Sequence, residues 1–286
     1  MNYKPTQFSY LPEVVKNLLI INGLFFLATY VMGSSFDVNL VKHLGLHNWQ
    51  SQDFRPHQLV THLFMHGGIW HILFNMFALW MFGNQLENVW GGKRFLNYFM
   101  ITGLGAAALH LGVTQLQISI IEAKMTSEQI SIVAKDGYST LMNGMNFTDP
   151  LMRKLNSLYH TPTVGASGAV FGLLLAFGML FPNTELRILT VFIIFIVFGF
   201  NIPNFLFFPL ILIFFLSQRN SRIRNSILFS IPIKAKYFVI IYGIIELWSG
   251  IQNNPNDNVA HFAHLGGMIF GYFLIKFWRK NSQHFY

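Results

Sequence analysis

Apolar runs long enough to cross a lipid bilayer recur along this chain between short polar segments. The hydrocarbon core of a bilayer is about 30 Å thick, and about 20 helical residues span it. Hydrophobic residues make up 53% of the 286 residues and charged residues only 10%, against about 25% charged residues in a soluble domain. We therefore predict an all-α polytopic membrane protein with six spanning helices. These are expected at about residues 17–33, 66–83, 95–114, 165–181, 237–251 and 259–278.

The basic residues favour a membrane orientation over a nucleic-acid partner. The formal net charge is +8, but Lys and Arg lie in short clusters between the apolar runs, as the positive-inside rule requires of cytoplasmic loops. With the N-terminus inside, most of the 19 Lys and Arg residues fall on the inner side. Both termini are therefore predicted to be cytoplasmic. Residues 1–12 show no cleavable signal pattern, so the first apolar run is expected to be retained.

Two segments do not fit a simple alternation of helices and loops. Gln115–Pro162 is too polar to span and is expected to form a long outer loop. Ile188–Leu216 is apolar, but Asn201–Asn204 interrupts it, and each half falls short of the roughly 20 residues of a span. Since basic residues flank this insertion on both sides, we predict a re-entrant or interfacial hairpin. A single crossing is the alternative. Residues 1–286 then form one membrane-embedded domain, with its core at about 17–278.

Four polar side chains are predicted to lie at one depth in the membrane. In this topology the helices at 66–83, 165–181 and 259–278 all run inward from the outer face. Ionisable groups inside a membrane are costly and mark functional sites by default. If Ile188–Leu216 crossed once, the last helix would be inverted and the group would come apart. The four residues are His71, Asn75, Ser167 and His264.

These residue types suit nucleophilic catalysis. A serine is a weak nucleophile unless a base takes its proton, and histidine is the side chain best suited to that task. Small residues around His264 would let its helix approach that of Ser167 closely. His71 and Asn75 are spaced i, i+4 and share a helix face, and both can donate to a developing oxyanion. Phe171, one turn beyond Ser167, is placed to stack on His264.

Helix packing is the structural alternative to catalysis. Gly168 and Gly172 form a GxxxG motif, in which Ser167 would only pack between helices. His71 and Asn75 would then be an interhelical hydrogen-bond pair.

Metal binding is the second alternative. Its candidate ligands would be His66, His71, His261 and His264. The chain has no Cys and no His-Glu-x-x-His motif, so no metal is expected. Glu246 is expected to bond within the bundle. We predict no carboxylate at the depth of His264 and hence a two-residue Ser–His site; His110 is assigned no role.

Three segments resemble the signatures of rhomboid intramembrane serine proteases. They are residues 64–75 (Phe-Met-His-Gly-Gly-Ile-Trp-His-Ile-Leu-Phe-Asn), 165–168 (Gly-Ala-Ser-Gly) and 263–267 (Ala-His-Leu-Gly-Gly). They occur in the family's order, and the similarity extends over about residues 18–277. The resemblance implies a six-helix bundle with Ser167 as nucleophile and His264 as general base. It also implies an oxyanion hole with its supporting residues: His71, Asn75, His66, Phe171 and Gly165.

The resemblance further implies the reaction and the partners. Rhomboids cleave single-span membrane proteins near a helix end, usually after a small residue. Bacterial members commonly carry Tyr at the position of Phe171, so stacking survives here and a hydroxyl is lost. We predict a serine endopeptidase without cofactor or metal, acting in the lipid bilayer on single-span proteins and binding no nucleic acid. The absence of organelle targeting signals favours a bacterial inner membrane.

Two other classes of function stay open at this point. A catalytically silent relative that binds membrane helices would not need both Ser167 and His264. A His-lined transporter or channel would show ion flux and no reaction with serine-directed reagents. The oligomeric state is left unspecified.

Overall fold

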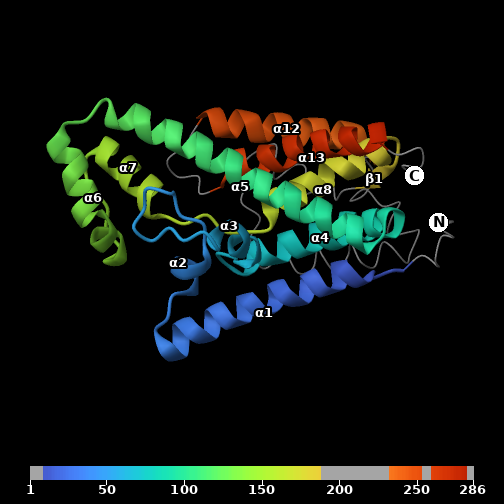
Figure 1. Ribbon diagram of the computed structural model, residues 1–286, viewed down its shortest axis with the longest axis horizontal. Helices are drawn as coiled ribbons and strands as arrows, with labels where there is room; N and C mark the ends of the chain where they lie inside the picture. Colours follow the sequence, from blue (N-terminus) through green and yellow to red (C-terminus); the bar gives the residue numbers. More distant parts are fainter. Residues whose placement is uncertain (1–8, 188–231, 253–258, 282–286) are drawn as a thin grey trace. The chain divides into compact units, whose positions relative to one another are not determined.

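The computed structural model describes residues 9–187, 232–252 and 259–281 (Figure 1). The chain divides into two compact units, residues 1–176 with 243–286 and residues 177–242. The expected hairpin at Ile188–Leu216 lies outside the described residues. The expectation of one domain over residues 1–286 stays a prediction.

The first long helix is capped by a side chain from another helix. α1 (Glu13–Phe36) lies along α4 (Ile69–Trp90). The first N–H groups of a helix have no intrahelical partner. Here the backbone N–H of Val14 donates to Glu87 Oε1 at 2.9 Å, and that of Val15 donates to Glu87 Oε2 at 2.7 Å. The carboxylate of α4 therefore closes the first turn of α1, where the helix dipole favours negative charge.

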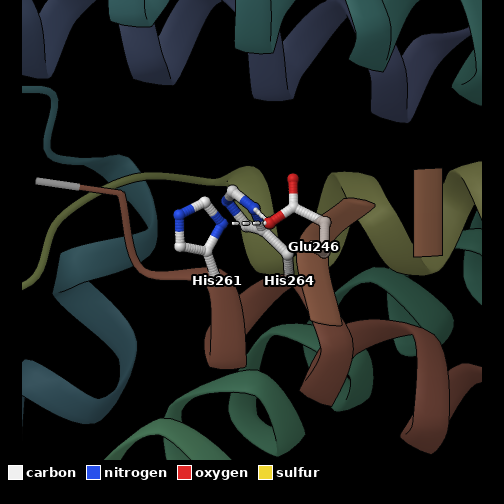
Figure 2. Close-up of side chains that lie close together, drawn as sticks. All are labelled: Glu246, His261 and His264. Atoms are coloured by element: carbon white, nitrogen blue, oxygen red, sulfur yellow. Dashed lines mark hydrogen bonds and ion pairs between the residues drawn. The ribbon is translucent and has the colours of Figure 1, made fainter. Parts of the chain in front are cut away.

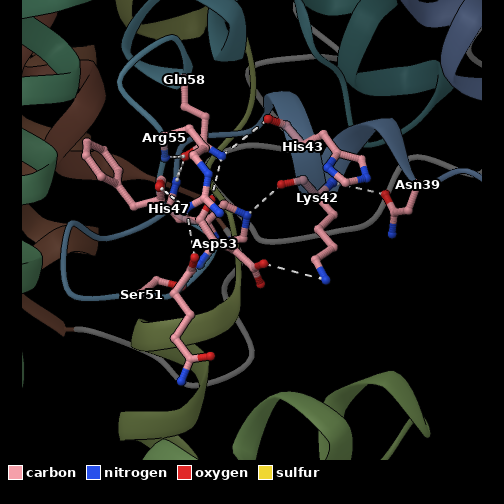
Figure 3. Close-up of polar contacts among 10 residues, drawn as sticks. Asn39, Lys42, His43, His47, Ser51, Asp53, Arg55 and Gln58 are labelled. Atoms are coloured by element: carbon pink, nitrogen blue, oxygen red, sulfur yellow. Dashed lines mark hydrogen bonds and ion pairs between the residues drawn. The ribbon is translucent and has the colours of Figure 1, made fainter.

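Between these helices, one buried glutamine organises the connecting segment. Oε1 of Gln58 accepts the backbone N–H of His47 at 3.3 Å and of Arg55 at 3.1 Å. Its Nε2 donates to the carbonyls of His43 at 3.3 Å and Asp53 at 2.9 Å (Figure 3). One side chain thus satisfies four backbone groups of a segment with little regular structure. The short helices here are α2 (Leu40–Leu44), α3 (Gln58–Thr61) and η1 (His62–Phe64).

The second predicted helix begins and ends later than expected. The sequence predicts this helix at residues 66–83, followed by a turn at Asn84–Arg94. In the structure α4 continues to Trp90, and only Gly91 separates it from α5 (Gly92–Glu122). No helix-breaking residue lies between Asn84 and Trp90, which explains the continuation. His66 precedes α4 in the bend that follows η1.

α5 is the central support for the C-terminal helix. α13 (His261–Asn281) packs along it (Figure 1). Gly266 of α13 faces Ala106 of α5. At Gly267 the approach is to another helix, because a Cβ there would overlap the backbone carbonyl of Gly168. The small residues near His264 therefore bring its helix against the one that carries Ser167, as predicted.

The stretch Gln115–Pro162 is largely helical, which corrects the prediction of a long loop. α5 runs to Glu122 and is followed by α6 (Ser127–Met142) and α7 (Pro150–His160). Ile118, Val133 and Leu155, one from each helix, form a small buried core. Capping signals were present in the sequence: Thr126 and Gln129 form a capping box, and Asp149 precedes Pro150 as N-cap.

The second unit holds a short antiparallel pair of strands. β1 (Glu185–Arg187) pairs with β2 (Pro232–Lys234), with Leu186 opposite Ile233. The unit also contains the end of α8 (Ser167–Leu180) and the start of α12 (Ala235–Gln252). Gly178 of α8 lies against Val239 of α12.

Length and hydropathy together qualify α1 and α5 as membrane spans. A third span is formed if α4 and the short helices before it, α3 and η1, make one crossing. A bend of 92° separates the short helices from α4. α8 is apolar but has only 14 residues. Within the described ranges two or three spans are thus assigned directly, fewer than the six predicted.

Candidate active site

Ser167 and His264 meet in the structure. Ser167 is the first residue of α8, and His264 lies in the first turn of α13. His264 Nε2 lies 2.9 Å from Ser167 Oγ, and the two residues are 97 positions apart in the chain. The histidine is buried, with 7% of its surface exposed. The distance is within the range at which a base can take a proton from a hydroxyl.

Phe171 holds the plane of the His264 ring. The two rings are stacked, with centroids 4.1 Å apart and planes inclined by 6°. This is the contact expected from the spacing of Phe171 and Ser167. Stacking leaves the ring edge, with its two nitrogens, available for polar contacts.

Gly165 and His71 lie against each other beside the serine. Gly165 has a φ of 124°, which side chains rarely adopt. A Cβ added to Gly165 would lie 2.7 Å from His71 Nε2 and 3.7 Å from Ser167 Oγ. Glycine is therefore required here for backbone conformation and for space. It allows His71 Nε2 to approach the serine.

A hydrogen bond sets the tautomer of His71. The backbone N–H of Gly67 donates to His71 Nδ1 at 3.3 Å. A neutral imidazole has one donor and one acceptor nitrogen. Because Nδ1 accepts, the proton of the neutral ring belongs on Nε2, the nitrogen beside Gly165. His71 can thus donate toward the site.

Asn75 and His66 support His71 from two sides. Asn75 is buried, and its Nδ2 donates to the carbonyl of His71 at 3.0 Å. An amide has two hydrogens, so one remains for a further acceptor. The His66 ring lies edge-on to that of His71, with centroids 5.1 Å apart. His66 is buried with 2% of its surface exposed.

A carboxylate lies on the other side of His264. Glu246 Oε2 is 2.6 Å from His261 Nδ1 and 2.9 Å from His264 Nδ1, and Figure 2 shows both rings turned toward it. The contact with His264 has the distance of an ion pair but not the angle of a hydrogen bond. The prediction that no carboxylate lies at the depth of His264 is therefore wrong. Helix periodicity alone does not show that α12 turns Glu246 toward α13.

Among the residues that the structure describes, Glu246, His261 and His264 form a group that could hold a metal ion. Their ligand atoms lie within 4.8 Å of one another, and two histidines with a glutamate form a known zinc set. Ligands about 2.1 Å from a tetrahedral ion lie roughly 3.4 Å apart. The nitrogen–oxygen distances of 2.6 and 2.9 Å are shorter. The arrangement fits direct polar contacts better than ligands spaced around an ion.

A small pocket opens beside the serine. His62, His110, Thr163, Gly165 and Ser167 contribute to its lining. Thr163 Oγ1 and His110 Nε2 are hydrogen-bonded at 2.8 Å. The space for a water-sized sphere is about 10 Å³, on the order of one water molecule.

The segment that leads to the serine is held by backbone hydrogen bonds. Leu46 and Thr163 pair in both directions, at 2.9 and 2.8 Å. The N–H of Gly165 donates to the carbonyl of His62 at 2.9 Å. Both the pocket wall and the start of α8 are therefore tied to the segment that precedes α4.

Comparison with known sequences identifies the family. The family model described as Rhomboid domain matches residues 53–217, more than half of the chain. The chain belongs to the rhomboid family. The match ends before α12 and α13, so His264 and Glu246 lie beyond it, and it is the structure that brings them to Ser167.

Individual relatives of this rhomboid are distant. Rhomboid protein 1, mitochondrial, of Saccharomyces cerevisiae is 26% identical over 128 residues, 45% of this chain and 26% of that protein. RHOMBOID-like protein 12, mitochondrial, of Arabidopsis thaliana is 29% identical over 174 residues, 61% of this chain and 43% of that protein. Rhomboid-like protein 16, chloroplastic, of the same plant is 30% identical over 105 residues, 37% and 32% of the two chains. The rhomboid thus spans less than half the length of these curated relatives.

Family membership and the long apolar helices make this rhomboid an integral membrane protein. The bacterial inner membrane stays a prediction, because the relatives named above are mitochondrial or chloroplastic.

Sequence reasoning missed part of the rhomboid's site. The sequence predicts that Glu246 bonds within the bundle and takes no part in the site, and it indicates no role for His110. One signal was available for Glu246, since an acidic residue in an apolar helix is costly unless it is paired. For His110 the partner Thr163 lies 53 residues away, and nothing local indicates the contact.

Proposed function

We propose that this rhomboid is an intramembrane serine endopeptidase that cleaves single-span membrane proteins. The observation that carries the proposal is the 2.9 Å contact between Ser167 Oγ and His264 Nε2. A helix-binding protein has no need of a half-buried serine paired with a buried base. The catalytically silent relative and the His-lined channel are therefore the alternatives that an experiment must exclude.

In the proposed reaction, His264 acts first as base and then as acid. Its Nε2 takes the proton of Ser167 Oγ as the oxygen bonds to the carbonyl carbon of the scissile peptide. The protonated ring then gives this proton to the leaving amine when the C–N bond breaks. In the second half-reaction His264 deprotonates a water molecule, which hydrolyses the acyl-enzyme. The pocket beside Ser167 has space for such a water.

An oxyanion forms at each tetrahedral intermediate and needs donors. The N–H of Ser167 lies at the start of α8, where backbone donors have no intrahelical partner. His71 Nε2 lies beside Gly165 and carries the ring proton in the inferred tautomer. Asn75 has one amide hydrogen beyond the one it donates to the His71 carbonyl. We assign these three groups to the oxyanion.

We also propose six spans with both termini in the cytoplasm of a bacterial cell. Because Ser167 begins α8 and His264 lies in the first turn of α13, both helices start at the same depth. The chain between them must therefore return to its starting face. In this proposal α12 is one crossing, which favours an insertion at 188–216 that does not cross. A cysteine placed at residue 256 should then react only from outside.

Reconstitution with a single-span substrate tests the activity. Wild type is compared with Ser167→Ala and His264→Ala, and a serine-directed fluorophosphonate is applied in parallel. We expect cleavage and labelling by wild type and loss of both in Ser167→Ala. Equal cleavage by all three proteins would reject the protease. Ion flux without labelling would favour the channel.

A further inference from the structure

We propose that Glu246 is a positioning residue for His264, so that the rhomboid's serine and histidine work with a third member. The inference rests on the proposed function and concerns the same site. Glu246 would hold the ring in the tautomer that can take a proton from Ser167. It would also stabilise the positive charge that the ring then carries.

The two nitrogens of His264 face two different partners. Nε2 lies 2.9 Å from Ser167 Oγ, and Nδ1 lies 2.9 Å from Glu246 Oε2. A neutral imidazole carries one proton. A carboxylate can only accept, so it draws that proton to Nδ1. Nε2 is then the acceptor that a serine hydroxyl needs.

The ring is also restrained in its plane. Phe171 stacks on it with an inclination of 6°. The stack and the carboxylate act in different directions, since one limits tilting and the other limits rotation within the plane. The N–H direction toward Oε2 is outside hydrogen-bond geometry. A small rotation within the stack would align it, and such contacts often tighten only when substrate binds.

The burial of Glu246 within an apolar helix indicates that this carboxylate has a function. Only 7% of its surface is exposed, whereas its neighbours Ile244, Leu247 and Trp248 are 62%, 47% and 64% exposed. α12 thus presents apolar side chains outward and its one carboxylate inward. A carboxylate in an apolar helix is costly unless it is paired. Here both partners are histidines on the first turn of α13.

His261 supplies a competing explanation. Its Nδ1 is 2.6 Å from Glu246 Oε2, closer than His264. If Glu246 only tethers α13 through His261, replacing Glu246 or His261 should lower activity by the same factor. If Glu246 positions His264, replacing Glu246 should affect the reaction far more.

The chemistry assigned to Glu246 requires no proton transfer to it. The proton of Ser167 moves to Nε2 of His264 and then to the leaving amine. Glu246 keeps its charge throughout, as the aspartate of a serine-protease triad does. It therefore acts through His264, and no bond to substrate forms or breaks at its oxygens.

Kinetics in proteoliposomes separate the two explanations. Glu246→Gln, Glu246→Asp and His261→Gln are compared with wild type on one single-span substrate. Glu246→Gln should lower kcat by about 30-fold or more, with KM within about threefold of wild type. Glu246→Asp should recover part of the loss. His261→Gln should lower kcat by less than about fivefold. Equal losses in Glu246→Gln and His261→Gln would overturn the proposal, as would a Glu246→Gln variant within threefold of wild type.

Nitrogen NMR of the histidine rings tests Glu246 without relying on proteolysis. In 15N-histidine protein, the signal absent from His264→Ala identifies His264. We expect the Nδ1–H tautomer in wild type and in Ser167→Ala, and its loss in Glu246→Gln. Retention of that tautomer in Glu246→Gln would overturn the inference whatever the activity. The opposite result is also informative. If the tautomer of His264 depends on Glu246 but the wild-type protein cleaves no substrate, the protease is rejected and the positioning role of Glu246 stands.

Discussion

His71 Nε2 occupies the space that a side chain at Gly165 would need, 2.7 Å from the position of a Cβ. The backbone there has a φ of 124°. The approach of His71 to the serine therefore depends on the absence of a side chain two residues before Ser167.

Gly165→Ala should impair activity strongly. The added methyl group must displace His71 or move the backbone that leads to Ser167, and alanine is also strained at this φ. We expect kcat to fall by about a hundredfold or more, the cost of a lost oxyanion donor. Gly112→Ala is the matched control, since nothing lies within 4 Å of a Cβ there. A Gly165→Ala protein as active as Gly112→Ala would contradict the role of this contact.

Joint replacement of His71 and Asn75 by alanine tests the oxyanion hole. The two side chains act only as charge develops in the transition state, so kcat should fall and KM should change little. We expect a loss of about a hundredfold or more in kcat. A fall of less than about threefold would reject the assignment. Fluorophosphonate labelling of Ser167 checks that the serine remains accessible.

Glu87→Gln should destabilise the bundle without touching the site. The carboxylate accepts the N–H groups of Val14 and Val15 and is buried with 5% of its surface exposed. The amide offers one acceptor oxygen in place of two. We expect a loss of about 1–3 kcal/mol in the free energy of unfolding. Glu13→Gln, at the exposed start of the same helix, should change it by less than about 0.5 kcal/mol.

The segment around His47 should loosen in acid. Burial lowers the pKa of His47 below its ordinary 6.5, although its hydrogen bond to the Lys42 carbonyl opposes the shift. The folded state then binds this proton less readily than the unfolded state. Its contribution to stability is complete above pH 6.5 and is lost as the pH falls through that value toward the lowered pKa.

Hydrogen exchange at pH 7.5 and 5.5 measures this loosening. Residues 39–58 should exchange faster at the lower pH, after correction for the intrinsic rate. His47→Gln should flatten the difference. His43→Gln, for a histidine whose ring is more exposed, serves as comparison. An unchanged pH dependence in His47→Gln would assign the effect to other groups, such as His160, whose pKa burial also lowers.

The sequence predicted the pair Ser167 and His264, and the structure brings the two together. Local patterns sufficed to predict this pair because glycines near both residues indicate that the two helices approach closely. The structure confirms the approach, since a Cβ added at Gly267 would overlap the backbone carbonyl of Gly168. Helix ends were less predictable. The apolar pattern fades before α4 ends at Trp90, and the capping signals of α6 and α7 lie in a stretch whose polarity suggested a loop.

Sequence by itself determined that the chain is a helical membrane protein of the rhomboid family, with a serine and a histidine on helices that can approach closely. Only the tertiary structure decided what surrounds that pair. Glu246 reaches His264 from α12, His110 reaches Thr163 from α5, and a bond from Gly67 sets the tautomer of His71. Each depends on the rotation of one helix against another, or on one backbone turn. The first two contacts join residues that lie far apart in the chain, so no local pattern encodes them. The third is local, but it depends on the backbone bend that precedes α4.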